Sequence, residues 1–177
     1  MEQKNDYGKI IKSKKQIQKK VKELAAEIEN DFDDEIIIIS VLKSSVYFTV
    51  DLTRYLELPI KVDFLGISRL PGENNRGVVR ITKDLELKIA EKQVILIDTI
   101  INTGLTHSYL LKSLKPRNPD NIHICTLIDN TKKRLVELPV SYHGFVDISD
   151  TFVVGYGLDY KEKYRNLPFI AEFSGYR

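Results

Sequence analysis

Apolar residues occur along the chain in two kinds of pattern, and the first consists of short continuous runs. These runs are mostly β-branched, and they occupy residues 36–41, 60–67, 78–81, 94–97 and 122–128. Apolar runs of this length are typical of strands. The run at 94–97 has no polar interruption and the run at 36–41 only a serine, Ser40, which is typical of strands covered on both faces of a parallel sheet.

The second pattern places apolar residues at helical spacing between these runs. Ser13 and Gln16 form the pattern of a capping box, which opens a predicted helix. Another helix is expected after Ser45 and through Glu57, because a helix rarely continues into a proline such as Pro59. The stripes that support the first and third predicted helices are Ile17, Val21, Leu24, Ala25 and Ile28, then His107, Leu110, Leu111 and Leu114.

The alternation of strands and helices predicts the fold class. It indicates an α/β protein with a twisted, mainly parallel sheet and helices on both faces. In such sheets a ligand binds beyond the carboxyl ends of the strands. No repeat or low-complexity linker interrupts the chain, so we expect a single domain over residues 1–177.

Composition and charge exclude several classes of protein. The chain has 27 basic and 25 acidic residues among 177, so no excess charge points to a nucleic-acid partner. No apolar run is long enough to span a membrane, and we expect no membrane partner. The single cysteine, Cys125, rules out an internal disulfide and suits a reducing cytoplasm, where we expect the protein to reside.

The segment 94–106 carries the clearest chemistry. A predicted strand runs past Asp98 into Asn102-Thr103-Gly104-Leu105-Thr106, and a predicted helix follows at once. A turn of small residues at a helix start presents free backbone N–H groups and suits a phosphate. The alternative is an ordinary loop in which Asn102 or Thr103 caps the helix.

Residues 42–45 form a second strand-to-helix turn that suits an anion. Here Leu42-Lys43-Ser44-Ser45 adds a cation to the helix start. The alternative is that Lys43 is a solvated loop residue.

These motifs together resemble those of the hypoxanthine-guanine phosphoribosyltransferases. Segment 94–106 resembles the phosphoribosyl-diphosphate (PRPP) signature of that family, and the segments 152–160 and 164–168 are its closest matches. The resemblance runs over nearly the whole chain. It implies a type I phosphoribosyltransferase fold with a small hood from parts of 1–12 and 140–177 and a mobile lid at 68–77. It also implies a homo-oligomer, either a dimer or a tetramer.

The resemblance also implies roles for individual residues. The 5′-phosphate and ribose of PRPP would bind at Asp98, Thr99, Asn102, Thr103, Gly104, Leu105 and Thr106. Pyrophosphate would bind at Lys43, Ser44 and Arg165, and the purine at Asn130, Phe152, Val153 and Asp159. Magnesium is the implied cofactor, with Asp98 and Asp159 as its candidate ligands.

Several positions depart from the family pattern. Asn102 replaces the aspartate that serves as general base, and an amide has no useful basicity at neutral pH. Thr99 replaces one acid of the acid pair, and Ser44 replaces a glycine of the pyrophosphate loop. Asn130 replaces the lysine that binds the exocyclic oxygen of a 6-oxopurine, and Arg69-Leu70 replaces the Ser-Tyr pair of the lid.

Two hypotheses about function follow, with a third kept open. The chain is either a purine-salvage enzyme that joins PRPP to hypoxanthine or guanine, or a catalytically degenerate paralogue that binds PRPP or a purine nucleotide and acts through a partner. The intact phosphate turn at 102–106, Phe152 and Arg165 favour ligand binding in both cases, whereas the replacements at the lid pair, the acid pair, the general base and the purine lysine favour the paralogue. The third reading is an α/β domain without a ligand.

Overall fold

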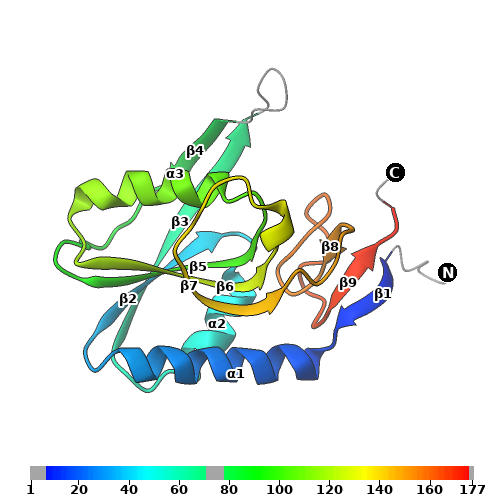
Figure 1. The fold of residues 1–177 in the computed structure, drawn as a ribbon, viewed down its shortest axis with the longest axis horizontal. Helices are drawn as coiled ribbons and strands as arrows, with labels where there is room; N and C mark the ends of the chain where they lie inside the picture. The colour runs from blue at the N-terminus through cyan, green and yellow to red at the C-terminus, as the bar shows by residue number, and fades with distance from the viewer. Residues whose placement is uncertain (1–6, 71–77, 176–177) are drawn as a thin grey trace.

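A six-stranded sheet forms the centre of the molecule (Figure 1). The structure is a computed structural model that describes residues 7–70 and 78–175. Its sheet has the strand order β4-β3-β2-β5-β6-β7, and all neighbouring strands are parallel except the antiparallel pair β3 and β4. The strands are β2 (Ile36–Leu42), β3 (Ile60–Leu70), β4 (Val78–Lys83), β5 (Gln93–Ile101), β6 (Asn121–Asp129) and β7 (Val140–Val146).

Helices cover both faces of this sheet, as the alternating pattern predicts. The helices α1 (Lys14–Asp31) and α2 (Val46–Thr53) lie on one face, and α3 (Leu105–Leu114) lies on the other (Figure 1). Two single 3-10 turns, η2 (Lys115–Arg117) and η3 (Thr131–Lys133), follow α3 and β6. The capping box at Ser13 and Gln16 is present, and the predicted stripe of α1 is buried throughout. Both predictions are confirmed.

The core is divided between the two faces by the alternation of side chains along each strand. In β2, Ile36 and Ile38 pack with α1 and α2, whereas Ile37 and Ile39 pack with Leu110 and other residues of α3. Such two-sided burial explains why this strand has no polar position before Ser40. Cys125 of β6 is fully buried, and burial raises the pKa of its thiol. A thiol that is buried in a strand and resists ionisation is not placed to act as a nucleophile.

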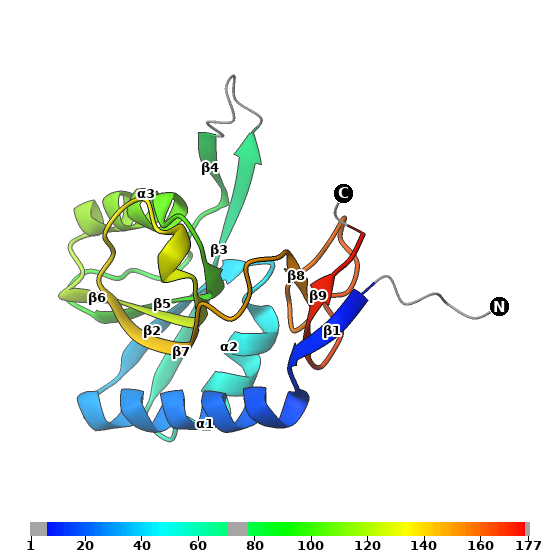
Figure 2. The ribbon, with the colours of Figure 1, turned by 45° about the vertical axis from the view of Figure 1, so that its right-hand side comes forward.

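A second, smaller sheet stands beside the main one (Figure 2). It is built from β1 (Tyr7–Lys12), β8 (Val153–Val154) and β9 (Ile170–Phe173), in the order β1-β9-β8. Its strands come from both ends of the chain, and β9 pairs antiparallel with both of its neighbours. Strand β7, although it belongs to the C-terminal part of the chain, joins the main sheet.

Two expectations about element boundaries were wrong. Helix α2 ends at Thr53 and not at Glu57, because Tyr55 donates to the Leu52 carbonyl and closes the last turn early. Residues 68–70, expected in the lid, continue β3 instead and pair with β4. The backbone hydrogen bonds of this hairpin outweigh the loop propensity of the sequence. The remainder of the expected lid, 71–77, lies outside the described residues.

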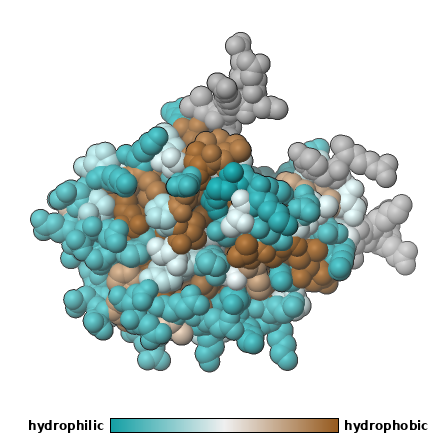
Figure 3. Space-filling view, viewed as in Figure 1, coloured by the Kyte–Doolittle hydropathy of each residue, from teal (hydrophilic) through white to brown (hydrophobic). Residues whose placement is uncertain are grey.

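The surface seen in Figure 3 is mainly hydrophilic, with several separate apolar patches between the charged areas. This agrees with a composition in which 29% of the residues are charged. In the described part of the chain, no helix has the length and apolar character that crossing a membrane requires.

The buried centre of the sheet gives a first testable prediction. Ile38 is fully buried between β3 and β5, whereas its register partner Val62 on β3 is 40% exposed. We expect Ile38→Ala to lower the free energy of unfolding by about 2–5 kcal/mol through lost burial and a residual cavity. The control Val62→Ala should cost less than about 1 kcal/mol. Urea unfolding of both variants measures the difference, and equal losses would contradict the assignment of the core.

Candidate functional site

A cleft of about 1400 Å³ lies at the carboxyl ends of the central strands. Its walls come from the ends of β2 and β5, the start of α3, and the segment that includes β8. The cleft therefore lies between the main sheet and the small sheet. This is the position that parallel α/β sheets offer to a ligand.

The turn before α3 has the conformation that an anion site requires. Gly104 is the N-cap of α3 and has a φ of 81°, in the left-handed region that favours glycine. A side chain there would also lie within 3.1 Å of Arg134 and Val136. Because the first N–H groups of a helix have no carbonyl partner within it, the helix start that follows Gly104 suits a phosphate. Neither Asn102 nor Thr103 is the N-cap, although Thr103 Oγ1 accepts a long hydrogen bond, of 3.5 Å, from the Leu105 N–H, so the alternative of a capping threonine holds in part.

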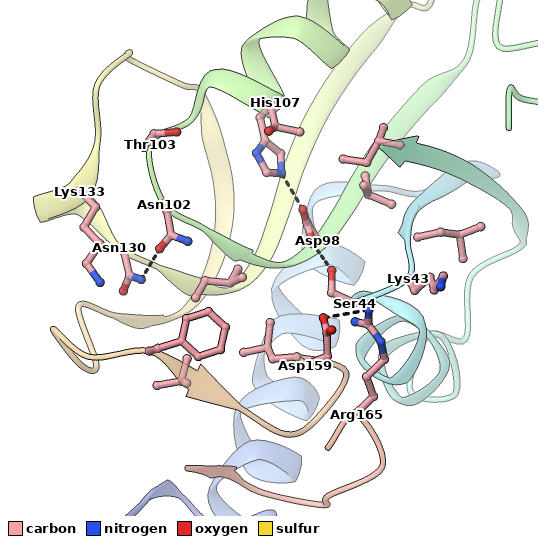
Figure 4. A pocket seen from close by; sticks show the side chains of 18 of the residues that line it. Lys43, Ser44, Asp98, Asn102, Thr103, His107, Asn130, Lys133, Asp159 and Arg165 are labelled. Carbon is pink, nitrogen blue, oxygen red and sulfur yellow. Dashed lines mark hydrogen bonds and ion pairs between the residues drawn. The ribbon is translucent and has the colours of Figure 1, made fainter. Parts of the chain in front are cut away.

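Asp98 joins three elements below this turn. Its carboxylate is almost buried, and Oδ1 accepts hydrogen bonds from Ser44 Oγ at 3.0 Å and from the Thr99 backbone N–H at 2.8 Å. The other oxygen, Oδ2, lies 3.2 Å from His107 Nε2 (Figure 4). His107 lines the cleft, although the sequence placed it only in the apolar stripe of the helix. The signal that could have found it is a histidine in the first turn after a phosphate-type loop.

Thr99 has a structural position and does not line the cleft. Its side chain is fully buried, and its hydroxyl donates to the Ser44 carbonyl at 2.9 Å. Asp98 and Thr99 therefore hold the 43–45 loop against β5 from two sides. A threonine at this place provides a donor to a backbone carbonyl, which a carboxylate cannot do.

The backbone of Gly157 packs closely against the Ser44 carbonyl of the same loop. It has a φ of 93°, and a Cβ there would lie 1.9 Å from the Ser44 carbonyl oxygen. The backbone of residue 157 can approach this closely only because it carries no side chain. The Gly157 N–H also donates to the Arg165 carbonyl at 2.9 Å, which joins this segment to the cation end of the cleft.

Two cations and two carboxylates lie at that end. Arg165 is 2.8 Å from Asp159 Oδ1 and 3.3 Å from Glu162 Oε2, and Lys43 Nζ is 3.1 Å from the same Glu162 oxygen (Figure 4 shows Asp159 and Arg165). The hydrogen bonds from Lys43 and then Arg165 hold the pKa of Glu162 below its usual value. Glu162 is therefore ionised at neutral pH. The alternative of a solvated Lys43 holds in part, because its side chain is 67% exposed, but it is also paired with Glu162.

The opposite end of the cleft carries an aromatic side chain and two amides, with Lys133 beside Asn130 (Figure 4). Asn130 donates from Nδ2 to Asn102 Oδ1 at 2.6 Å (Figure 4). Phe152 is 39% exposed and lines the cleft beside Val153. Phe152 is not a core residue, because it precedes the two-residue strand β8 (Val153–Val154) and remains partly exposed.

Most predicted site residues meet in this one cleft. The lining includes Lys43, Ser44, Asp98, Asn102, Thr103, Gly104, Thr106, Asn130, Phe152, Val153, Asp159 and Arg165. Thr99 and Leu105 do not line it. Thr99 lies below the loop, and the Leu105 side chain is exposed on the first turn of α3.

The carboxylates do not form a ready metal site. No group of three or more potential metal ligands occurs in the described ranges 7–70 and 78–175. Both oxygens of Asp159 and Oδ1 of Asp98 already have partners within the chain, and Oδ2 of Asp98 lies 3.2 Å from His107 Nε2. Mg²⁺ commonly binds through one or two carboxylates together with substrate phosphates. The residues present therefore do not fit a magnesium site made by the protein alone.

Comparison with known proteins identifies the family. The family model for the phosphoribosyl transferase domain matches residues 8–161. The hypoxanthine-guanine phosphoribosyltransferase of Bacillus subtilis is 39% identical over 170 residues, which cover 95% of this chain and 94% of that protein. The chain belongs to the hypoxanthine-guanine phosphoribosyltransferase family.

Solved structures of this family share the fold described above. A hypoxanthine-guanine phosphoribosyltransferase from Bacillus anthracis has a TM-score of 0.87 and 41% identity, and the match covers 94% of this chain and 98% of that one. A hypoxanthine phosphoribosyltransferase from Staphylococcus aureus has a TM-score of 0.90 and 35% identity, over 96% and 92% of the two chains. The predicted type I phosphoribosyltransferase fold is therefore confirmed.

The close approach at Gly157 gives a prediction for this phosphoribosyltransferase site. We expect Gly157→Ala to displace the 43–45 loop, because its Cβ would overlap the Ser44 carbonyl. Pyrophosphate affinity should fall more than about tenfold, and the free energy of unfolding by about 1–3 kcal/mol. Calorimetric titration and urea unfolding measure the two effects. Gly8→Ala is the control, because its Cβ meets only the Ser174 hydroxyl, which can rotate away; an equal effect there would contradict the prediction.

Proposed function

We propose that this chain is a purine-salvage phosphoribosyltransferase that joins PRPP to a 6-oxopurine, hypoxanthine or guanine. The reaction forms a bond between a purine ring nitrogen and C1′ of the ribose, breaks the C1′–O bond to pyrophosphate, and releases the proton of the purine N–H. The observation that carries the proposal is the single cleft that contains a phosphate turn, a cation end and an aromatic wall. The activity named for its relatives at 39% identity and below supports the same conclusion.

Different residues of the cleft would bind different parts of the ligand. The helix start at 103–106 would hold the 5′-phosphate, and Lys43 with Arg165 would hold the pyrophosphate. Phe152 offers an aromatic face to a flat base, with the Val153 backbone beside its edge. Much of the rate in such a transfer comes from positioning and from stabilising the departing charge, and both are available here.

The step that the cleft supports least is the removal of the purine proton. Asn102 stands where a base is needed, and its Oδ1 already accepts a hydrogen bond from Asn130. General-base catalysis is typically worth about 10²–10⁴-fold in rate. We therefore expect turnover that is slow and not absent.

The amide pair also favours a second candidate function, a paralogue that binds PRPP or a purine nucleotide without turnover. In that case the protein would act through a partner.

Under either function we propose a cytoplasmic homo-oligomer, dimer or tetramer. Because the chain has no ready metal site of its own, we propose that Mg²⁺ binds together with the phosphates of PRPP.

The first test measures pyrophosphate release. PRPP is supplied with hypoxanthine, guanine, xanthine or adenine, with and without Mg²⁺, and PRPP and GMP are titrated by calorimetry in parallel. We expect release with hypoxanthine or guanine in the presence of Mg²⁺. Binding of GMP without release from any base would favour the second function, and the absence of both would contradict both.

The second test restores the missing base. We expect Asn102→Asp to raise the turnover of a 6-oxopurine by at least about tenfold and at most about 10⁴-fold, because a carboxylate there accepts the proton. The variant keeps an acceptor for Asn130, so the pocket should stay assembled. Asn118→Asp makes the same change at an exposed position after η2 and should leave turnover unchanged.

Adding Asn130→Lys to Asn102→Asp should raise turnover further, since a lysine donates to the 6-oxo group. Unchanged turnover in both Asn102→Asp and the double variant with Asn130→Lys would indicate a site that serves binding alone.

A further inference from the structure

The cation end of the cleft already holds an anion that belongs to the chain. Glu162 Oε2 contacts both Lys43, at 3.1 Å, and Arg165, at 3.3 Å, and all three residues line the cleft. These contacts are hydrogen bonds between charged groups, the kind that a phosphate oxygen makes with lysine and arginine. Glu162 therefore uses the donors that a diphosphate ligand would need.

Arg165 does not depend on Glu162 for its position. Its NH1 donates to the Gly157 carbonyl at 2.8 Å, and its NH2 lies 2.8 Å from Asp159 Oδ1. Both contacts are shorter than the contact with Glu162. Removal of the Glu162 charge should therefore leave the guanidinium in place, with one side of NH2 available to a ligand.

The charges at this end cancel when Glu162 is present. Lys43 and Arg165 supply two positive charges, and Asp159 and Glu162 supply two negative ones. A neutral cluster gives little attraction to a diphosphate at a distance. Without the Glu162 carboxylate, the same cluster carries one net positive charge.

Glu162 can be displaced at small cost. Its side chain is 64% exposed and that of Lys43 is 67% exposed, so their ion pair is screened by solvent. Exposed pairs of this kind contribute little to stability. The contact between Asp159 and Glu162 is a hydrogen bond from the Glu162 backbone N–H to Asp159 Oδ2, at 2.8 Å, and does not involve the Glu162 carboxylate. A bound diphosphate can therefore replace the carboxylate, but it must compete with it.

We propose that Glu162 is a specificity-determining residue of this cleft. It competes with the diphosphate group of a ligand for Lys43 and Arg165, and so weakens the binding of PRPP and pyrophosphate. It does not weaken the binding of a nucleoside monophosphate, because all its hydrogen bonds and ion pairs lie at the cation end. The inference rests on the proposed function, which places a diphosphate at that end.

Calorimetric titration of pyrophosphate, PRPP and GMP tests this proposal. Glu162→Gln keeps the size of the side chain and removes its charge. We expect pyrophosphate and PRPP to bind about fivefold tighter, in proportion to the strength of an exposed ion pair. GMP affinity should change by less than about twofold. The matched control is Glu35→Gln, which removes a carboxylate from the exposed pair with Lys61, 3.0 Å apart, at the opposite end of the sheet.

The outcomes separate this proposal from the proposed function. Unchanged or weaker pyrophosphate binding in Glu162→Gln, beside measurable GMP binding, would overturn the role of Glu162 and leave the function standing. Equal gains for GMP and pyrophosphate would indicate an effect of net charge only, and would also overturn it. If none of the three ligands binds either protein, both proposals fail. Equal thermal unfolding of the two proteins excludes a folding defect as the cause.

Discussion

The cleft depends on one attachment, that of the 43–45 loop to strand β5. The Ser44 hydroxyl donates to Asp98, and the Ser44 carbonyl accepts from Thr99. Because both acceptor and donor are buried, breaking either contact would leave an unpaired polar group in the protein interior, which is costly. The positions of Lys43 on one side and Gly157 on the other follow from this attachment.

The same attachment explains a departure that looks like a loss in the sequence. A hydroxyl in place of the second acid removes a charge from the cleft, but Thr99 supplies a donor to the loop backbone. The Asp98 carboxylate contacts groups of the chain itself, namely Ser44, the Thr99 backbone and His107 of α3. Asp98 and Thr99, at the position of the family's acid pair, both bind Ser44 of the 43–45 loop. The cleft therefore has fewer charged groups for a ligand.

The fold could be predicted from the sequence to a large extent, because the apolar pattern is regular and two-sided. The α1 stripe, the buried β2 run and the α3 stripe each lie where their spacing placed them. One error arose where pairing with another strand decides the outcome, in the extension of β3 to Leu70 through its hydrogen bonds with β4, and the other where a local hydrogen bond from Tyr55 to Leu52 ends α2 early. The cleft lining followed from family motifs. The contact of Glu162 with Lys43 and the pairing of Asn102 with Asn130 join residues far apart in sequence and had no local signal.

The pairing of β9 with β1 and β8 has a consequence for the order in which the protein can be assembled during synthesis. All strands of the main sheet are available once Val146 has been synthesised, but the core on its α1 and α2 face also contains Tyr156, Leu158 and Ile170. The wall that carries Phe152 belongs to a sheet whose middle strand is Ile170–Phe173. The cleft therefore acquires its Phe152 wall only after Ile170–Phe173 has been synthesised, whereas the turn that precedes α3 is made from residues much earlier in the chain.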